Sequence, residues 1–202
     1  MKNRTALLNR NTKETKITGS LNIDGSGEIS ISTGIGLLDH MLELFAFHGL
    51  FDLQIKAKGD LHIDIHHTNE DIGIELGKAF KKALSDMEGI RRFGFASVPM
   101  EKVLANVTVD ISGRGLYERK KNAEAGSSPS DERGYSLKDA DHFFEGLASH
   151  MGVNLIISIA PMAQDLHATL EPVFKALGVA LDQATQIDAR KKGIPSTKGI
   201  ID

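Results

Sequence analysis

The sequence predicts an α+β fold made of two similar strand–strand–helix–strand–helix halves that pack together as one unit. Segments in which every second residue is apolar indicate strands, and segments with apolar residues three or four apart indicate helices. The same order of segments occurs twice, in residues 1–90 and again in residues 91–202. We therefore expect two half-repeats that share a core, since 202 residues suffice for one sizeable domain or two small, tightly packed ones.

In the first half, alternating apolar residues predict strands at residues 15–24, 28–32, 51–57 and 61–65. Helical spacing predicts helices at residues 37–48 and 68–85, and Gly49 is a typical residue to end the first of them. In the strand predicted at 61–65, the alternation would direct His62, Asp64 and His66 to the face opposite the apolar residues.

The second half repeats this order with predicted strands at residues 103–111 and 153–160 and predicted helices at residues 140–150 and 166–184. The polar segment between the first strand and the first helix predicts a mobile loop near residues 115–137. Residues 191–198 are basic and contain Gly193 and Pro195, so we expect an irregular basic tail.

Composition excludes several classes of protein. The chain has no cysteine, which rules out disulfides, thiolate metal sites and cysteine nucleophiles. No apolar run approaches the ~20 residues that span a bilayer, and the start does not look like a secretory signal, so we predict a cytoplasmic protein without a membrane partner. A formal net charge of −3 argues against nucleic acid as a partner.

The histidines make the internal repeat visible. Residues 39–48 and 141–150 are identical at five of ten positions, and both segments contain a histidine at the second and the last position. The spacing continues downstream, because 26 residues separate His40 from His66 and 25 separate His142 from His167. Seven of the eight histidines fall inside this pattern. A function proposed for these histidines must therefore apply to both copies of the repeat.

Two histidine–glutamate pairs have the spacing of metal ligands. His66 and Glu70, like His167 and Glu171, are four residues apart at a helix start and therefore lie on the same face. His67 is rotated by ~100° from His66 about the helix axis, so we expect it to address a different ion. Imidazole and carboxylate ligands without sulfur suit manganese, zinc or iron better than calcium.

Each of these residues also has a plainer interpretation. A single histidine–glutamate pair is usually a solvated helical pair, and His40 is compatible with a buried core histidine. His48 and His150, each at a helix end, are compatible with simple interactions with the helix dipole. His62 is interpreted as an exposed strand residue. Because the pattern occurs twice in register, we favour metal binding for the repeated residues.

Several long motifs resemble the imidazoleglycerol-phosphate dehydratase family. They are residues 10–15 (RNTKET), 32–41 (STGIGLLDHM), 66–71 (HHTNED), 110–114 (DISGR), 171–176 (EPVFKA) and 195–199 (PSTKG). The resemblance covers nearly the whole chain. It implies a duplicated fold of the ribosomal protein S5 domain 2 type, two bound Mn²⁺ ions per active site, a small phosphorylated imidazole substrate, and a homo-oligomer of trimers assembled into a 24-mer.

The resemblance also implies roles for individual residues. One ion would be held by His40, His67, His167 and Glu171, and the other by His66, Glu70 and His142. Substrate contacts are implied at Glu14, His48, Arg92, Arg114, Lys175, Ser196 and Lys198, and the ligands His40, His66, Glu70, His167 and Glu171 would also face the substrate. The arginines, lysines and serine suit a phosphate group, which prefers charge-assisted donors. Taken alone, Arg114 and Lys198 would be ordinary surface charges.

The family's usual residue at position 168 is histidine, whereas this chain has Ala168. The ion held by His66, Glu70 and His142 would therefore have one protein ligand fewer. In the dehydration that the resemblance implies, bound metal ions would supply Lewis acidity to the imidazole ring, and the electron-rich ring would expel the neighbouring hydroxyl group to give a diazafulvene. Loss of a carbon-bound proton then gives the enol and finally the ketone, with Glu14 as the expected proton carrier.

Two other classes of function remain open from the sequence. The chain could be a metal-dependent hydrolase of a phosphorylated metabolite, which would release inorganic phosphate. It could also be a metal-organised assembly that binds metal and forms oligomers, with activity weakened by Ala168.

Overall fold

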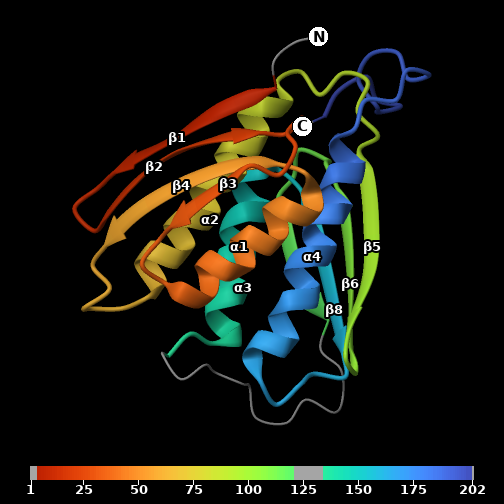
Figure 1. Ribbon diagram of the computed structural model, residues 1–202. Helices are drawn as coiled ribbons and strands as arrows, with labels where there is room; N and C mark the ends of the chain where they lie inside the picture. The colour runs from red at the N-terminus through yellow and green to blue at the C-terminus, as the bar shows by residue number, and fades with distance from the viewer. Residues whose placement is uncertain (1–3, 121–133, 202) are drawn as a thin grey trace.

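A computed structural model describes residues 4–120 and 134–201 (Figure 1). The first half contains β1 (Thr5–Asn11), β2 (Thr15–Asn22), β3 (Ile29–Ser32), α1 (Gly36–Gly49), β4 (Asp52–Gly59) and α2 (His66–Leu84). The second half contains β5 (Phe93–Met100), β6 (Val103–Asp110), β7 (Leu116–Lys120), α3 (Leu137–Met151), β8 (Asn154–Ala160) and α4 (Leu166–Thr185). The predicted α+β duplication is confirmed, with three strands rather than two before the first helix of each half.

The strand predicted at residues 61–65 is wrong. Residues 60–65 form turns, and α2 begins directly at His66. The amide of Ile63 donates to the carbonyl of Asp60, and the amide of Asn69 already donates to the carbonyl of Ile65, so the helical hydrogen bonds start where the alternation suggested a strand. The apolar alternation there was too short to distinguish a strand from a turn that leads into a helix.

Three strands were missed. β1 and β5 pair with β2 and β6 as antiparallel hairpins, and β7 pairs in parallel with β8. Residues 116–120 of the predicted loop form β7, and the loop's central part, residues 121–133, lies outside the described residues. The tail after α4 is irregular, as predicted, and lacks helix and strand over residues 189–201.

Each half folds into a four-stranded sheet, with strand order β1-β2-β4-β3 in the first half and β5-β6-β8-β7 in the second. Figure 1 shows the four helices between the two sheets. Helix α1 packs on α4, and α2 packs on α3, so each helix pair takes one helix from each half. The shared core is therefore built across the duplication, which explains why the two halves form one unit.

Glycines let the paired helices approach closely. A Cβ atom on Gly178 of α4 would lie 2.3 Å from the carbonyl oxygen of Phe45 on α1. In the other pair, a Cβ atom on Gly73 of α2 would lie 2.4 Å from the carbonyl oxygen of Phe143 on α3. Any side chain at these positions would separate the helices and the histidines that they carry.

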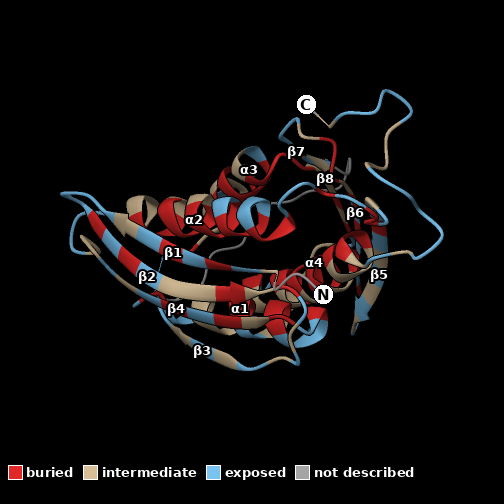
Figure 2. Cartoon of the chain, turned by 90° about the horizontal axis from the view of Figure 1, so that it is seen from above, coloured by how far each residue is buried: buried red, intermediate tan, exposed pale blue. Residues whose placement is uncertain are grey.

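Burial follows the strand and helix periods that the sequence indicated. In β2 and β4, the inward residues Ile17, Leu21, Leu53 and Ile55 are buried while their neighbours face outward (Figure 2). Phe143, Phe144 and Phe174 pack as an aromatic group between α3 and α4. In the described part of the chain, no helix has both the length and the apolar character needed to cross a membrane.

Candidate metal and anion sites

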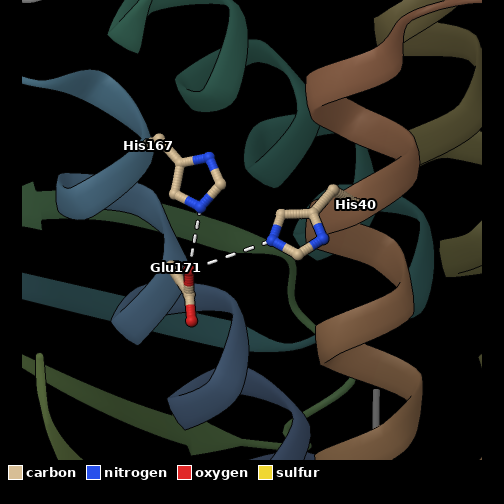
Figure 3. A group of neighbouring side chains, drawn as sticks. All are labelled: His40, His167 and Glu171. Carbon is tan, nitrogen blue, oxygen red and sulfur yellow. Dashed lines mark hydrogen bonds and ion pairs between the residues drawn. The ribbon is translucent and has the colours of Figure 1, made fainter.

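His40, His167 and Glu171 converge where α1 and α4 cross, and we call them the α1–α4 cluster (Figure 3). Nε2 of His167 lies 2.9 Å from Oε2 of Glu171, and Nε2 of His40 lies 3.9 Å from the same oxygen. One ligand atom from each residue lies within 4.8 Å of the other two. Two imidazoles and one carboxylate at this separation form a donor set that fits a divalent transition metal.

Local structure holds these side chains in place. Asp39, in the first turn of α1 and directly before His40, accepts hydrogen bonds from the amide and the hydroxyl of Thr33, which tie this turn to the preceding loop. At the start of α4, the carboxylate of Asp165 accepts from the amides of His167 and Ala168 as an N-cap. Both histidines therefore lie near the start of a helix, beside a segment whose backbone an aspartate holds in place.

The charge on Glu171 is stabilised by its neighbours. Burial acts to raise the pKa of Glu171, but hydrogen bonds from Lys175 and His167 outweigh it and hold this pKa below its usual value. Nζ of Lys175 lies 2.5 Å from Oε1 of Glu171, while Oε2 faces the imidazoles. Glu171 is thus an anionic group with one oxygen engaged by a lysine and the other facing the imidazoles.

His66, Glu70 and His142 form the second group, which we call the α2–α3 cluster. Nδ1 of His66 lies 2.8 Å from Nδ1 of His142, and Nε2 of His66 lies 3.5 Å from Oε2 of Glu70. The α3 helix that carries His142 begins with a capping box between Ser136 and Asp139. This cluster has the same donor set as the first.

The two clusters are equivalent in the duplicated fold. His40 and His142 occupy matching places on α1 and α3, and His66 with Glu70 matches His167 with Glu171. Each cluster joins the first helix of one half to the second helix of the other. The internal repeat therefore places matching residues in the two clusters. Among the described residues, the α1–α4 cluster is the group in which one ligand atom from each of three residues lies within 4.8 Å of the others, and the pair of metal sites stays a prediction.

His67 lies apart from the α1–α4 cluster of its own chain. Its Nδ1 lies 3.1 Å from Oδ2 of Asp60, and the hydrogen bond to Asp60 raises the pKa of His67. The carbonyl of Glu14 accepts from the amide of Asp60, and the charge of Glu14 adds to the same pKa shift. Glu14, Asp60 and His67 therefore form a third group of residues, separate from the two clusters. The assignment of His67 to the ion of His40 stays a prediction.

Sequence reasoning missed Asp60. The argument for metal sites relied on residues that recur in both halves, and position 161, which corresponds to Asp60 when His66 is matched to His167, is a proline. A carboxylate just after a strand and seven residues before a histidine is too common a pattern to be selected without the structure.

Four of the residues implied as phosphate ligands gather around a small cavity of about 160 Å³, which we call the anion pocket: Arg92, Arg114, Ser196 and Lys198. The guanidinium of Arg92 binds the carboxylate of Asp110 and donates to the carbonyl of Pro195, so it is fixed in place. The amide of Arg114 donates to the hydroxyl of Ser112, 3.3 Å away. The pocket thus combines a rigid arginine with groups from the C-terminal tail.

The anion pocket and the α1–α4 cluster lie at opposite ends of α4. The amide of Arg92 donates to the carbonyl of Ala184 in the last turn of α4, whereas His167 stands in its first turn. At ~1.5 Å per residue, these two points are about 25 Å apart. Figure 1 shows α4 running from its N-terminal end at the bottom to the tail at the top. A single chain does not bring the cluster and the pocket together.

The remaining predicted residues have simpler surroundings. His48 lies near the end of α1, and its pKa is lowered first by partial burial of the imidazole and then by the positive charge of Lys175. Nδ1 of His150 lies 3.0 Å from the carbonyl oxygen of Gly146, a plain interaction at the helix end. His62 lies in the turn before α2 and is exposed. A larger hollow of about 900 Å³, near Arg4, Ser85 and Gln186, contains none of the predicted site residues.

Comparisons with known proteins all identify the same family. The family model described as Imidazoleglycerol-phosphate dehydratase matches residues 33–181. An imidazoleglycerol-phosphate dehydratase of Pelobacter propionicus is 49% identical over 98% of this chain and 99% of its own length. The corresponding protein of Citrifermentans bemidjiense is 51% identical over 97% of this chain and 98% of its own length.

Two solved structures have the same fold. The crystal structure of imidazoleglycerol-phosphate dehydratase from Staphylococcus aureus matches with a TM-score of 0.78 and 29% identity, over 91% of this chain and 99% of the other. The structure of the Pyrococcus furiosus protein in complex with (S)-C348 also matches with a TM-score of 0.78, at 34% identity over 95% and 98%.

Proposed function

Because this chain belongs to the imidazoleglycerol-phosphate dehydratase family, hydro-lyases of histidine biosynthesis, we propose that it dehydrates imidazoleglycerol phosphate at a site containing divalent metal ions. The observation that carries the metal part of this proposal is the convergence of His40, His167 and Glu171 within 4.8 Å of one another. Family membership favours elimination of water over hydrolysis of the phosphate ester.

The donor chemistry of both clusters fits manganese, the ion that the family resemblance implies. Each cluster offers two imidazole nitrogens and one carboxylate, without sulfur, which suits Mn²⁺, Zn²⁺ or Fe²⁺. His40, His167 and Glu171 would hold one ion, and His66, Glu70 and His142 the other, with His67 completing the first set from elsewhere. Bound ions would supply Lewis acidity to the nitrogen atoms of the substrate's imidazole ring.

The chain's own charged groups would position the rest of the substrate. The anion pocket offers Arg92, Arg114 and Lys198, whose charge-assisted hydrogen bonds suit a phosphate monoester. Lys175, held by Glu171, would place a second positive charge beside the metal cluster. These contacts would fix the two ends of the substrate and leave its central carbons between them.

Glu14 is our candidate for moving the proton that the elimination releases. Its side chain is exposed at the β1–β2 turn, and its charge acts on the imidazole of His67. Thr12 fixes this turn, because its hydroxyl accepts hydrogen bonds from the amides of Glu14 and Thr15. A carboxylate on a turn whose backbone is fixed in this way, beside the proposed metal ligand His67, can take a carbon-bound proton and return it to the product.

The proposed active site requires more than one copy of the chain. The substrate is small, so a separation of about 25 Å between the α1–α4 cluster and the anion pocket of one chain is too great for it to bridge. We therefore include a homo-oligomer in the proposal, in which the metal cluster of one copy meets the anion pocket of another. Trimers assembled into a 24-mer remain our expectation for its size, and a cytoplasmic location remains a prediction.

The outer faces of the two sheets support a docking surface on the second half. Three matching outward positions are polar in the first sheet and apolar in the second: Thr5 corresponds to Phe93, Lys16 to Leu104, and Gln54 to Ile156. At a fourth, Leu7 and Phe95, both sheets are apolar. Phe93 and Leu104 are both exposed. The side chain of Arg92 lies over the ring of Phe93, 5.0 Å from its centroid, so this face is continuous with the anion pocket. A second copy is the occupant that would also complete the site.

A direct assay tests the proposed reaction. Purified protein with Mn²⁺ should convert imidazoleglycerol phosphate to imidazole-acetol phosphate, followed by ultraviolet absorbance, and complete chelation should abolish the conversion. Release of inorganic phosphate instead would identify the hydrolase. Binding of metal without any product would identify the metal-organised assembly without activity.

A further inference from the structure

Asp60 and His67 form a carboxylate–imidazole pair. The proposed reaction uses His67 as a metal ligand and gives the carboxylate of Asp60 no role. Both carboxylate oxygens of Asp60 lie within 3.3 Å of Nδ1 of His67. The side chain of Asp60 is only 12% exposed, and among the described residues its one ion-pair partner is His67. A nearly buried carboxylate is costly unless it is paired, so its contact with the imidazole is the reason it is tolerated.

Backbone hydrogen bonds on both sides of Asp60 hold it in this position. The amide of Asp60 donates to the carbonyl of Glu14, and its carbonyl accepts from the amide of Ile63. The preceding residue is Gly59, where a Cβ atom would lie 1.9 Å from the hydroxyl oxygen of Thr68. Only glycine lets the chain pass this close to the first turn of α2, and this approach brings the Asp60 carboxylate to His67.

The pair exists in the first half alone. Asp64 and Asp165 each precede the first helical histidine by two residues and accept a hydrogen bond from its amide, so the two loops align without a gap at this end. In that alignment Pro161 corresponds to Asp60, and Ala168 corresponds to His67. The second half thus lacks both members together, while it keeps the other cluster residues.

We propose that Asp60 is the positioning residue for His67 as a metal ligand, an inference that rests on the proposed metal-dependent function. By accepting a hydrogen bond from Nδ1–H, Asp60 fixes the tautomer in which Nε2 carries the lone pair. Among the described residues, Nε2 of His67 has no hydrogen-bond partner, and the imidazole is about one-third exposed. Asp60 therefore presents Nε2 outward, toward an ion whose other ligands come from an adjacent copy.

Four variants of the full-length protein test this role: His67→Ala, Asp60→Ala, Asp60→Asn and Asp60→Glu. Binding of Mn²⁺ is measured from the electron paramagnetic resonance signal of the free ion, and metal content from elemental analysis. We expect Asp60→Ala to weaken one class of Mn²⁺ site by ~10–100-fold, as loss of such a partner does in other metal sites. Asp60→Asn keeps an acceptor oxygen and should weaken it less, and Asp60→Glu should recover part of the affinity.

Asp64→Asn is the matched control, since it removes the same charge from the same loop, keeps an acceptor oxygen for the amide of His66, and alters no hydrogen bond to the imidazole of His67. Equal losses in Asp60→Ala and Asp64→Asn would reduce the effect to local charge and overturn the positioning role. A loss in His67→Ala with none in Asp60→Ala would also overturn it, while leaving the proposed function intact. If the wild-type protein binds no Mn²⁺ and His67→Ala changes nothing, the proposed metal dependence itself fails.

Thermal unfolding of the metal-free proteins separates positioning from folding. A merely structural role of Asp60 would lower the melting temperature of the metal-free variant and leave the Mn²⁺ affinity of the folded fraction unchanged. The positioning role predicts the reverse: similar melting temperatures without metal, and weaker binding of Mn²⁺ to folded protein.

Discussion

Nδ1 of His66 lies 2.8 Å from Nδ1 of His142, so a histidine of the first half and a histidine of the second half meet at the crossing of α2 and α3. At this distance one nitrogen donates a hydrogen and the other accepts it, which requires at least one neutral imidazole. The matching contact between α1 and α4 is made by His40 with Glu171 and His167. Each cluster thus depends on one helix from each half.

This relationship predicts how metal content responds to single changes. His142→Ala removes a donor from the α2–α3 cluster, and His40→Ala removes one from the α1–α4 cluster. Each variant should therefore lose about one of two ions per chain, and the double variant should lose both, because the clusters share no residue. Elemental analysis after extensive dialysis measures this. Loss of both ions from either single variant would show that the clusters do not act as separate sites.

The anion pocket predicts a different response for Lys198. Lys198→Ala removes a positive charge from the pocket without touching either cluster. We expect substrate binding to weaken by ~1.5–3 kcal/mol, as for a lost charged hydrogen bond, with unchanged metal content. Lys192→Ala is the control, because Lys192 lies in the same basic tail outside the pocket. The assignment fails if metal content falls while the KM for the substrate stays the same.

The asymmetry of the two sheets predicts which face mediates assembly. Phe95 and Leu7 occupy matching outward positions on β5 and β1 and are 72% and 73% exposed. Phe95→Lys places a charge in the proposed apolar interface and should shift the protein to smaller species in light scattering. Leu7→Lys makes the same change on the first sheet, where the neighbouring outward positions Thr5 and Lys16 are polar, and should leave the mass unchanged. The opposite pattern would transfer the interface to the first sheet.

Much of this architecture follows from periodicity. The four helices and the inward residues of β2, β4, β6 and β8 were predictable, because burial selects apolar residues at helix and strand periods. β1, β5 and β7 were not predicted. β5 carries Phe93 and Phe95 outward, so apolar residues lie on its solvent face and the usual alternation of burial is hidden. Its place in the sheet depends on pairing with β6, which is a tertiary property.

The site was predictable only in part for a related reason. Repetition within the chain is enough to identify the histidines and glutamates of both clusters. It does not indicate that α1 pairs with α4 rather than with α2, since that choice depends on helix packing between the halves. It also passes over residues without a repeat, such as Asp60 and Asp110, whose roles depend on contacts with His67 and Arg92.

Asp52, which belongs to neither cluster, is expected to contribute to the stability of the fold in a way that depends on pH. Its carboxylate accepts hydrogen bonds from the amides of Ser26 and Glu28 and from the side chain of Asn22. Burial acts to raise the pKa of Asp52, but these bonds together lower it below its ordinary value. The contribution is therefore complete above the unfolded-state pKa and is lost as the pH falls through the lower, folded-state pKa.

Asp52→Asn should accordingly destabilise the protein at pH 7 by about 1 kcal/mol, since a neutral amide accepts hydrogen bonds through one oxygen only. The difference from wild type should shrink at acidic pH, once the wild-type carboxyl group is also protonated. Urea unfolding at several pH values, with metal removed, measures it. A difference independent of pH down to the acid transition would contradict the assignment to the charged form.

Ala168 gives the sharpest prediction about the metal sites. It corresponds to His67 in the duplicated fold, follows His167 on α4 and carries only a methyl group, which donates nothing to a metal. If the family pattern applies, the ion of His66, Glu70 and His142 has one protein ligand fewer, and water takes that place. We therefore expect two ions bound with unequal affinity, the more weakly bound one in the α2–α3 cluster and the first to be lost on dilution.

Ala168→His should strengthen this weaker site and raise turnover with it. Ala168→Leu, which adds a side chain of similar bulk without a donor atom, should do neither. Mn²⁺ titrations of the three proteins decide the matter, because two equally tight sites in the natural sequence, unchanged by the added imidazole, would refute this place for residue 168.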